Sequence, residues 1–486
     1  MTGPGRWRPT GVSLVTLCAW SLLGSAALSA QAPPPAPTHQ NVLLIVADDV
    51  GVDRVAAYGE SPTAGPTTAL DTIAQYGVVF RNAYANPVCS PSRAMLLTGR
   101  YGLRTGVGGN VQWGGGDAYE LSPEEDSLPK RLADTHRTAA VGKWHLGSDM
   151  GSGYVHPTLL GFEYFSGSKM QLGGLTSPPT AYYGWEKNVA TQAGAVQFQR
   201  IAYSTSDHVD DVLSIVDTLG EDEPWFIQLS FNAAHTPFHV PPDDLTTIKA
   251  TEASSAALKH RAAVEAMDVE IRRLLMSLPV SVLANTWVIF VADNGTPGPA
   301  ISDPALRAKG KGTMYESGIR VPLIVLGPGV VDPGRQVRAL VNTTDIFTTV
   351  LQMAGIPGAA QHLPSDSVSL MPYLTDPTAA PQREWAYSEL FLPNGPGPYI
   401  ERRRVVRNER FKLLEIAREG VRHRAMFDLK DDPTESTDLL MNGTPPENRV
   451  EVFYELLELM SNIACSSPPG DDDSTRPPLS TRPTLP

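Results

Sequence analysis

The most reactive stretch of the sequence is Cys89-Ser-Pro-Ser-Arg93, which places a thiol one helical turn before a guanidinium. A helix-like apolar segment follows, so the cysteine would lie at a helix N-terminus, where backbone N–H groups and the helix dipole favour negative charge. The alternative is a buried structural cysteine, a common role for an unpaired thiol. A structural cysteine has no use for Arg93, and the stretch therefore indicates a reactive position.

Two polar pairs could bind a metal ion. Asp48-Asp49 and Asp293-Asn294 each follow an apolar run, and each taken alone fits a solvated loop or a turn. Together they offer only oxygen ligands, namely three carboxylates and one amide carbonyl. Calcium and magnesium prefer such ligands, whereas zinc prefers histidine or cysteine. The combination predicts a site for a hard cation.

Four further residues could neutralise an anion or move a proton. They are Lys143, His145, His235 and Lys311. A lone histidine is more often a packed residue than a catalyst. His145 and His235, however, both follow apolar runs, as the acidic pairs do. An anionic substrate needs positive charge around it, and its leaving group needs an acid. His239 and Lys309 are close neighbours that compete for the same roles.

The elements that must position these residues are four apolar runs, each followed by polar residues. The runs cover 42–47, 139–141, 225–231 and 287–292. Such runs are typical of parallel strands that are buried on both faces. Helix-like stretches lie between them, at 67–75, 92–97, 207–219 and 256–278. This alternation predicts an α/β fold whose polar strand ends meet at one crevice, because ligands bind outside the carboxyl ends of parallel strands.

Six motifs resemble, in order, those of the arylsulfatase-like type I sulfatases, a formylglycine-dependent family of the alkaline phosphatase superfamily. They are Asp48-Asp49, Cys89-Ser-Pro-Ser-Arg93, Gly142-Lys-Trp-His145, Asn232-Ala-Ala-His235, Asp293-Asn-Gly295 and Lys311-Gly-Thr-Met-Tyr-Glu316. A C-terminal Phe427-Asp-Leu429 with Asp432-Pro-Thr-Glu435 is also similar. The resemblance covers about residues 41 to 440. It implies an α/β fold like that of alkaline phosphatase: a large, mostly parallel sheet flanked by helices, with a smaller C-terminal subdomain of antiparallel sheet plus helix.

The resemblance also implies how the reaction is carried out. Cys89 would be oxidised to formylglycine, and one hydroxyl of the hydrated aldehyde would attack sulfur. The bound ion would be calcium, with magnesium as the lesser alternative. The implied metal ligands are Asp48, Asp49, the modified Cys89, Asp293 and Asn294.

The same resemblance implies a role for each remaining residue. His235 would be the general acid for the departing alcohol, assisted by Lys311. His145 would deprotonate the second hydroxyl, which expels sulfate, while Asp293 could accept the proton of the first. The implied catalytic residues are Cys89, Arg93, Lys143, His145, His235 and Lys311, in which the two lysines neutralise sulfuryl oxygens and Arg93 stabilises the diol.

The chain is predicted to have five parts. They are a signal peptide (1–30), a Pro-rich spacer (31–40), the catalytic α/β domain (41–382), the C-terminal antiparallel-sheet subdomain (383–465) and a disordered tail (466–486). Arg6 and Arg8 precede an apolar run that is too short and too interrupted for a spanning helix. We therefore expect export to the periplasm or the medium without a stable membrane anchor.

The composition limits the partners. The chain has a net charge of −13 and no basic block after the predicted signal peptide, which argues against nucleic-acid binding. The expected partners are a sulfated small molecule or glycan as substrate and a formylglycine-generating enzyme for maturation. The alternatives are a phosphonate or phosphate ester hydrolase of the same superfamily and a non-catalytic relative that binds sulfated glycans.

Substrate specificity is expected in the loops 105–120, 165–200 and 391–400. These loops carry aromatic residues that could stack on a ring or simply pack, namely Trp113, Tyr182, Tyr183 and Trp185. A basic cluster is interpreted as solvated positions on an edge strand and its turn, with a grip on an anionic polysaccharide as the alternative. The cluster contains Arg402, Arg403, Arg404, Arg407 and Arg410.

Overall fold

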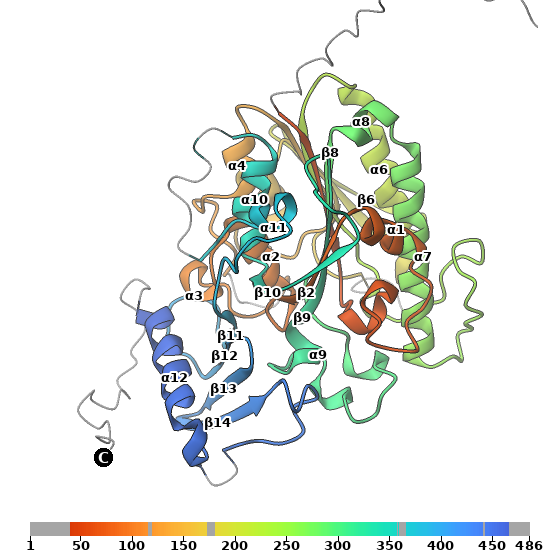
Figure 1. Ribbon diagram of the computed structural model, residues 1–486. Helices are drawn as coiled ribbons and strands as arrows, with labels where there is room; N and C mark the ends of the chain where they lie inside the picture. The colour runs from red at the N-terminus through yellow and green to blue at the C-terminus, as the bar shows by residue number, and fades with distance from the viewer. Residues whose placement is uncertain are drawn as a thin grey trace, which may run out of the picture. The chain divides into compact units, whose positions relative to one another are not determined.

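The computed structural model describes residues 39–114, 119–172, 180–356, 358, 366–440 and 443–465. These residues form a large sheet between two layers of helices and a smaller antiparallel sheet (Figure 1). The predicted signal peptide, most of the spacer and the predicted tail lie outside the described residues. Every helix within the described ranges is too short or too polar to span a membrane.

The large sheet has ten strands and is mostly parallel. From edge to edge they are β10 (Arg335–Asn342), β2 (Val78–Tyr84), β9 (Arg320–Leu326), β8 (Thr286–Ala292), β1 (Asn41–Ala47), β7 (Trp225–Ser230), β3 (Arg137–Lys143), β4 (Tyr164–Ser168), β5 (Gly184–Thr191) and β6 (Gly194–Ile201). β9 and β5 run antiparallel to both of their neighbours. The four strands predicted from apolar runs, β1, β3, β7 and β8, are adjacent and parallel.

Helices cover both faces of this sheet (Figure 1). One face carries α1 (Thr68–Tyr76), α6 (Ser204–Leu219), α7 (Ala256–Ser277) and α8 (Val280–Ala284), and the other carries α2 (Cys89–Thr98), α4 (Leu128–Leu132), α10 (Asp345–Met353) and α11 (Met371–Thr375). The short helices α3 (Gly102–Thr105), α5 (His156–Leu159) and α9 (Glu316–Ile319) lie in the connections. All seven residues of β1 are buried, because both faces of the central strand pack against helices.

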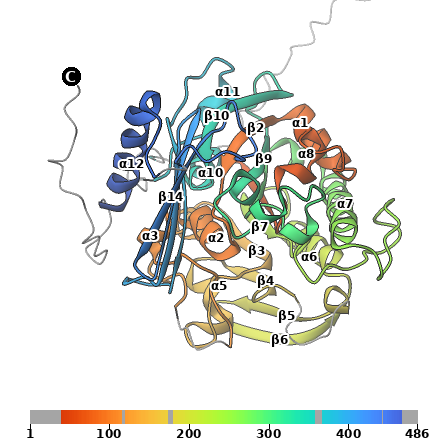
Figure 2. The ribbon, with the colours of Figure 1, turned by 90° about the horizontal axis from the view of Figure 1, so that it is seen from below.

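The second sheet is antiparallel and consists of β11 (Ala386–Leu392), β12 (Glu401–Arg407), β13 (Phe411–Arg418) and β14 (Val421–Asp428), in that order. Helix α12 (Val450–Cys465) covers its outer face (Figure 2). Its inner face shares an apolar cluster with β2 and α9, in which Phe427 packs with Tyr84 and Ile319. The predicted small sheet plus helix is therefore confirmed, while the boundary at residue 382 stays a prediction.

Two expectations were wrong in detail. The segment 165–200 is not mainly a loop, because β5 and β6 form a hairpin at one edge of the large sheet (Figure 2). The basic cluster does not lie on an edge strand, because β12 pairs with a strand on each side. Arg404 and Arg407 are buried there and are bonded to Glu415 and Tyr84. Charge in the interior of a sheet is tolerated when it is paired.

Candidate active site

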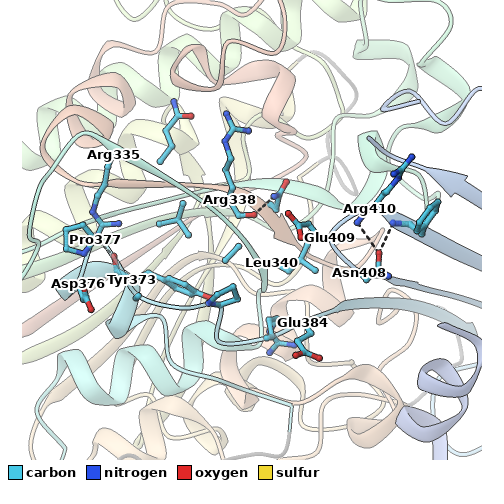
Figure 3. Close-up of a pocket in the computed structure, with 18 of the residues that line it drawn as sticks. Arg335, Arg338, Leu340, Tyr373, Asp376, Pro377, Glu384, Asn408, Glu409 and Arg410 are labelled. Carbon is cyan, nitrogen blue, oxygen red and sulfur yellow. Dashed lines mark hydrogen bonds between the residues drawn. The ribbon is translucent and has the colours of Figure 1, made fainter. Parts of the chain in front are cut away.

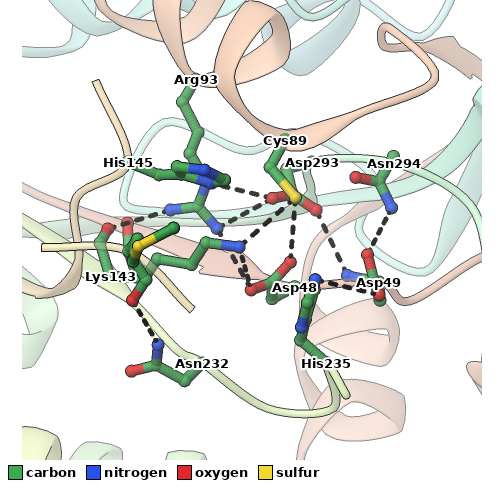
Figure 4. Close-up of polar contacts among 12 residues, drawn as sticks. Asp48, Asp49, Cys89, Arg93, Lys143, His145, Asn232, His235, Asp293 and Asn294 are labelled. Atoms are coloured by element: carbon green, nitrogen blue, oxygen red, sulfur yellow. Dashed lines mark hydrogen bonds and ion pairs between the residues drawn. The ribbon is translucent and has the colours of Figure 1, made fainter. Parts of the chain in front are cut away.

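The predicted site residues converge at the carboxyl ends of the central strands (Figure 4). Asp48 and Asp49 follow β1, Asp293 and Asn294 follow β8, Lys143 ends β3, and His145 lies two residues beyond it. His235 lies five residues beyond β7, and Cys89 begins α2 after a short turn from β2. Parallel strands place these ends on one side of the sheet, which is why residues far apart in the sequence meet.

The acidic residues form a compact group with the cysteine. Asp48, Asp49, Cys89 and His235 each offer a ligand atom, and these atoms all lie within 4.8 Å of one another. All four residues are buried. Buried carboxylates that share so small a volume repel one another unless cations separate them. His235, which the sequence predicts only for proton transfer, has its imidazole within this group.

The oxygen atoms around this group fit a hard cation as ligands. The side-chain oxygen of Asn294 is buried and accepts no hydrogen bond from any described residue, while its Nδ2 donates to Asp49 Oδ1 at 2.8 Å. The backbone N–H of Asp49 donates to Asp293 Oδ1 at 3.2 Å. Asp49 has a positive φ of 64°, an uncommon backbone conformation for this residue. An unsatisfied amide oxygen among carboxylates matches the preference of calcium and magnesium.

Three cations surround Cys89 and the carboxylates. The ammonium of Lys143 lies 2.6 Å from Asp48 Oδ2 and 3.3 Å from Cys89 Sγ. The ammonium of Lys311 lies 2.5 Å from Asp49 Oδ1 and 3.4 Å from the same sulfur. The guanidinium of Arg93 donates twice to Asp293 Oδ2, at 2.8 and 3.0 Å. Positive charge therefore faces residue 89 from two sides.

Burial and these cations shift the protonation of the acids. Burial, the largest single influence, would raise the pKa of Asp48 and Asp49, but the surrounding cations together outweigh it, chiefly Lys143 beside Asp48 and Lys311 beside Asp49, and hold both pKa values below the usual one. Burial raises the pKa of the Cys89 thiol to about 12. The thiolate is the nucleophilic form of cysteine, so an unmodified Cys89 is a poor nucleophile here.

The two histidines differ in their environment. Both ring nitrogens of His145 are buried without a hydrogen-bond partner in the described part of the chain, and burial holds its pKa well below the usual value. His235 Nδ1 lies 2.6 Å from the Thr236 carbonyl, and its Nε2 lies 3.7 Å from Asp49 Oδ2. Burial also lowers the pKa of His235. In neutral His145 the unprotonated ring nitrogen has no hydrogen-bond partner among the described residues and can accept a proton.

Several positioning contacts were not predicted from the sequence. Ser90 Oγ donates to the His145 carbonyl at 2.7 Å and accepts from the Val111 N–H at 3.0 Å, so it links the start of α2 to β3. His260 Nε2 lies 2.9 Å from the Asp49 carbonyl. The Ser-Pro-Ser spacing was a signal for Ser90. His260 lies near the start of α7, where no local pattern distinguishes it from a residue that only packs.

The competing residues lie outside the site. His239 stacks on Tyr182 at 3.6 Å and lies 3.0 Å from the Tyr203 hydroxyl, and Lys309 donates to the carbonyl of Glu435 at 2.8 Å. Tyr182 is buried, and its hydroxyl donates to the His235 carbonyl at 2.8 Å. His235 and Lys311, and not these two neighbours, therefore lie beside Cys89 and the acidic residues.

A hollow of about 900 Å³ lies along the edge strand β10 (Figure 3). Its lining includes Arg335, Arg338, Tyr373, Glu384 and Arg410. None of the predicted site residues lines it. The hollow and the cluster around Cys89 are therefore separate features.

Two family profiles match the sequence. The sulfatase profile matches residues 40–356, which is more than half of the chain. This chain belongs to the sulfatase family. The second profile, N-sulphoglucosamine sulphohydrolase, C-terminal, matches residues 309–462. The two matches together cover the large sheet and the small sheet of this sulfatase.

Curated relatives of this sulfatase are sulfuric ester hydrolases. N-acetylgalactosamine-6-sulfatase of Homo sapiens is 30% identical over 368 residues, which cover 70% of this chain and 66% of the relative. Steryl-sulfatase of Rattus norvegicus is 28% identical over 434 residues, covering 71% and 72%. The chain therefore spans about two thirds of the length of these relatives. The family identifies the chain as a sulfuric ester hydrolase.

Solved structures of other proteins share the fold. Ps i-CgsB in complex with k-i-k-neocarrahexaose has a TM-score of 0.71 at 22% identity and covers 90% of this chain and 96% of its own. BT4656 in complex with D-glucosamine-2-N,6-O-disulfate has a TM-score of 0.68 at 20% identity, covering 90% and 100%. The predicted fold class is confirmed.

Proposed function

We propose that this sulfatase hydrolyses a sulfate ester to an alcohol and inorganic sulfate with a formylglycine made from Cys89. The observation that carries this proposal is the position of Cys89, which begins α2 with the ammonium groups of Lys143 and Lys311 at 3.3 and 3.4 Å from its sulfur. A hydrated aldehyde there would supply one hydroxyl for attack on sulfur and a second for the later release of sulfate.

A calcium ion is proposed at the oxygen ligands of this site. Asp48, Asp49, Asp293 and Asn294 would hold it, together with the modified residue 89. A bound divalent ion would supply positive charge that polarises the sulfuryl oxygens. The unsatisfied oxygen of Asn294 supports this assignment, because a buried amide oxygen without a donor is otherwise costly.

The chain's own groups divide the remaining tasks. Lys143 and Lys311 would donate hydrogen bonds to sulfuryl oxygens, since both ammonium groups already face residue 89. In its protonated form, which the Asp49 carboxylate 3.7 Å from Nε2 favours, His235 would give its Nε2 proton to the departing alcohol, with Lys311 beside it. His145 would take a proton from the second hydroxyl at a vacant ring nitrogen. Arg93 would keep Asp293 and residue 89 in place.

The proposed substrate is a sulfated glycan or a smaller aryl or carbohydrate sulfate. Two structural neighbours were solved with a carrageenan oligosaccharide and a sulfated glucosamine, which supports a carbohydrate. Trp113, in one of the loops expected to set specificity, is half-buried; its ring centroid lies 4.9 Å from that of Tyr154 and 4.9 Å from Lys169 Nζ. We also propose that a formylglycine-generating enzyme modifies Cys89 and that the protein is exported from the cytoplasm.

Replacing Cys89 tests the nucleophile. Cys89→Ala is expected to lower the turnover rate of 4-nitrophenyl sulfate at least about a thousandfold, because the attacking group is lost. The unfolding temperature should change little. Cys465→Ala is the matched control and should keep its activity. Mass analysis of the peptide containing residue 89 should show the aldehyde in the active protein. Multiple turnovers by Cys89→Ala would exclude the proposal.

Removing the metal tests the ion. Dialysis against a calcium chelator is expected to lower the unfolding temperature and the activity, and calcium should restore both, since a ligand that binds only the folded state stabilises it. Asp49→Ala should lose the calcium-dependent shift in unfolding temperature. An unfolding temperature that does not respond to calcium in the wild type would contradict the proposed site.

The main alternative is a phosphate or phosphonate ester hydrolase. Comparing kcat/KM for 4-nitrophenyl sulfate and 4-nitrophenyl phosphate separates the two, because the leaving group is the same. We expect the sulfate ester to be the better substrate. A large preference for the phosphate ester would favour the alternative.

A further inference from the structure

Backbone hydrogen bonds attach the loop that carries Lys311 to the large α/β region. We refer to residues 309–316 as the Lys311 loop. The N–H of Lys311 donates to the Thr296 carbonyl at 3.0 Å, and the N–H of Gly312 donates to the Pro87 carbonyl at 2.8 Å. Pro87 lies two residues before Cys89, so the loop is fastened to the turn that presents the proposed nucleophile.

The C-terminal sheet holds the same loop from the other side. Arg403 of β12 donates from Nη1 to the Gly312 carbonyl at 2.7 Å. Glu435, in the motif after β14, accepts from the Glu316 N–H at 2.7 Å. Lys309 donates to the carbonyl groups of Thr434 and Glu435 at 2.7 and 2.8 Å. The middle of the loop is therefore bonded to this sheet, and both of its ends are bonded to the segment that follows β14.

A buried charge network makes this attachment rigid. The side chain of Lys412 is fully buried, and its ammonium lies 3.0 Å from Glu316 Oε1 and 2.7 Å from Glu435 Oε1. Glu316 Oε2 accepts from the Tyr84 hydroxyl at 2.8 Å, at the end of β2. A buried ammonium is costly unless it is paired, so displacing either carboxylate would weaken the pairing of a buried charge. The network therefore opposes movement of the loop.

We infer that Arg403, Lys412 and Glu435 are positioning residues that set Lys311 Nζ against the reacting ester, which gives the C-terminal sheet a part in catalysis. The inference rests on the proposed role of Lys311 beside the leaving group. A lysine side chain is a long flexible stem, so the backbone that carries it decides where its charge lies. A displacement of about 1 Å can lower a rate by about a hundredfold.

The test is the dependence of rate on the leaving group. Phenyl sulfate has a poorer leaving group than 4-nitrophenyl sulfate and needs more help from a proton donor. Arg403→Gln and Glu435→Gln are expected to lower kcat about tenfold more for phenyl sulfate than for 4-nitrophenyl sulfate, with a smaller change in KM. Arg403→Lys should recover part of the loss, since an ammonium can also donate to the Gly312 carbonyl.

The matched control is Arg404→Gln. Arg404 is the next residue of β12, faces the opposite side of the sheet, is buried and pairs with Glu415, away from the Lys311 loop. Its loss should lower the rates of both esters by the same factor. Equal losses for both esters in Arg403→Gln and Glu435→Gln would overturn the inference. Lys311→Met tests the underlying role separately, because it should show the largest difference between the esters, and no difference would refute the proposed function of Lys311.

Discussion

At the scale of single residues, the environment of Cys89 explains why a plain thiol would be unsuited to this site. The side chain is fully buried, and burial raises its pKa to about 12, although two ammonium groups lie within 3.4 Å of the sulfur. The lysines are already paired with Asp48 and Asp49. Their charge is therefore shared with the carboxylates, and the site is better suited to a hydroxyl nucleophile whose oxygen lies among hydrogen-bond donors.

Trp113 gives a prediction at this scale. Trp113→Ala is expected to raise KM for a sulfated oligosaccharide about fivefold, because an aromatic face that stacks on a sugar ring contributes about 1 kcal/mol. The values of kcat and KM for 4-nitrophenyl sulfate should change little, since that ester has no sugar. Kinetics on both substrates check this expectation. Equal effects on the two substrates would assign Trp113 to packing.

At the scale of elements, the parallel strands must approach closely to bring their ends together. Gly142 of β3 lies between β7 and β4 and has a positive φ of 95°. A Cβ atom built on Gly142 would lie 1.9 Å from the Ser230 carbonyl oxygen. The next residue is Lys143, so the close approach of two strands sets the position of a proposed catalytic ammonium.

Replacing this glycine should separate the strands. Gly142→Ala is expected to lower the free energy of unfolding by about 3 kcal/mol, through backbone strain and overpacking together. Gly153→Ala is the control, because Gly153 also has a positive φ, of 62°, but a Cβ atom there meets open space. It should cost only about 1 kcal/mol. Denaturant unfolding measures both, and similar losses would show that strand spacing does not depend on Gly142.

At the scale of the whole molecule, buried neutral histidines couple stability to pH. His208 and His239 are buried, and burial lowers the pKa of each to about 3. An unfolded histidine has a pKa near 6.5, so the unfolded chain takes up protons first when the pH falls. The stability that these residues contribute is fully present above about pH 6.5 and is lost as the pH falls toward 3.

Replacing His208 measures how much one histidine contributes to the pH dependence of the free energy of unfolding. His208→Phe removes one proton from the difference between the folded and unfolded states, and its ring would remain among aromatic neighbours, since His208 packs near Trp185 and Phe231. The free energy of unfolding should then fall less steeply between pH 6 and 4, by about 1.4 kcal/mol per pH unit. Urea unfolding at several pH values measures the slope. Parallel slopes for the variant and the wild type would contradict this assignment.

Much of the central fold could be predicted because the local pattern is strong there. Val42–Ala47 is apolar on both faces, and the structure places it as the central strand β1. The edge strands were harder to predict. In β6, Gln197 and Gln199 alternate with apolar residues as they would in a strand, but the segment is largely exposed and lacks a continuous apolar run like that of β1. The basic residues of β12 were predicted at an edge because their pairing with Glu415 and Tyr84 cannot be seen in the sequence.

The sequence by itself determined the residue types of the site, the order of the motifs and the strands that carry them, because apolar runs and the polar residues after them are local features. Tertiary structure alone decided how these groups pair. Only the folded chain brings His260 to Asp49, Ser90 to His145 and Glu435 to Glu316. These contacts join segments that are 55 to 211 residues apart, and their geometry depends on packing between elements, which no local pattern records.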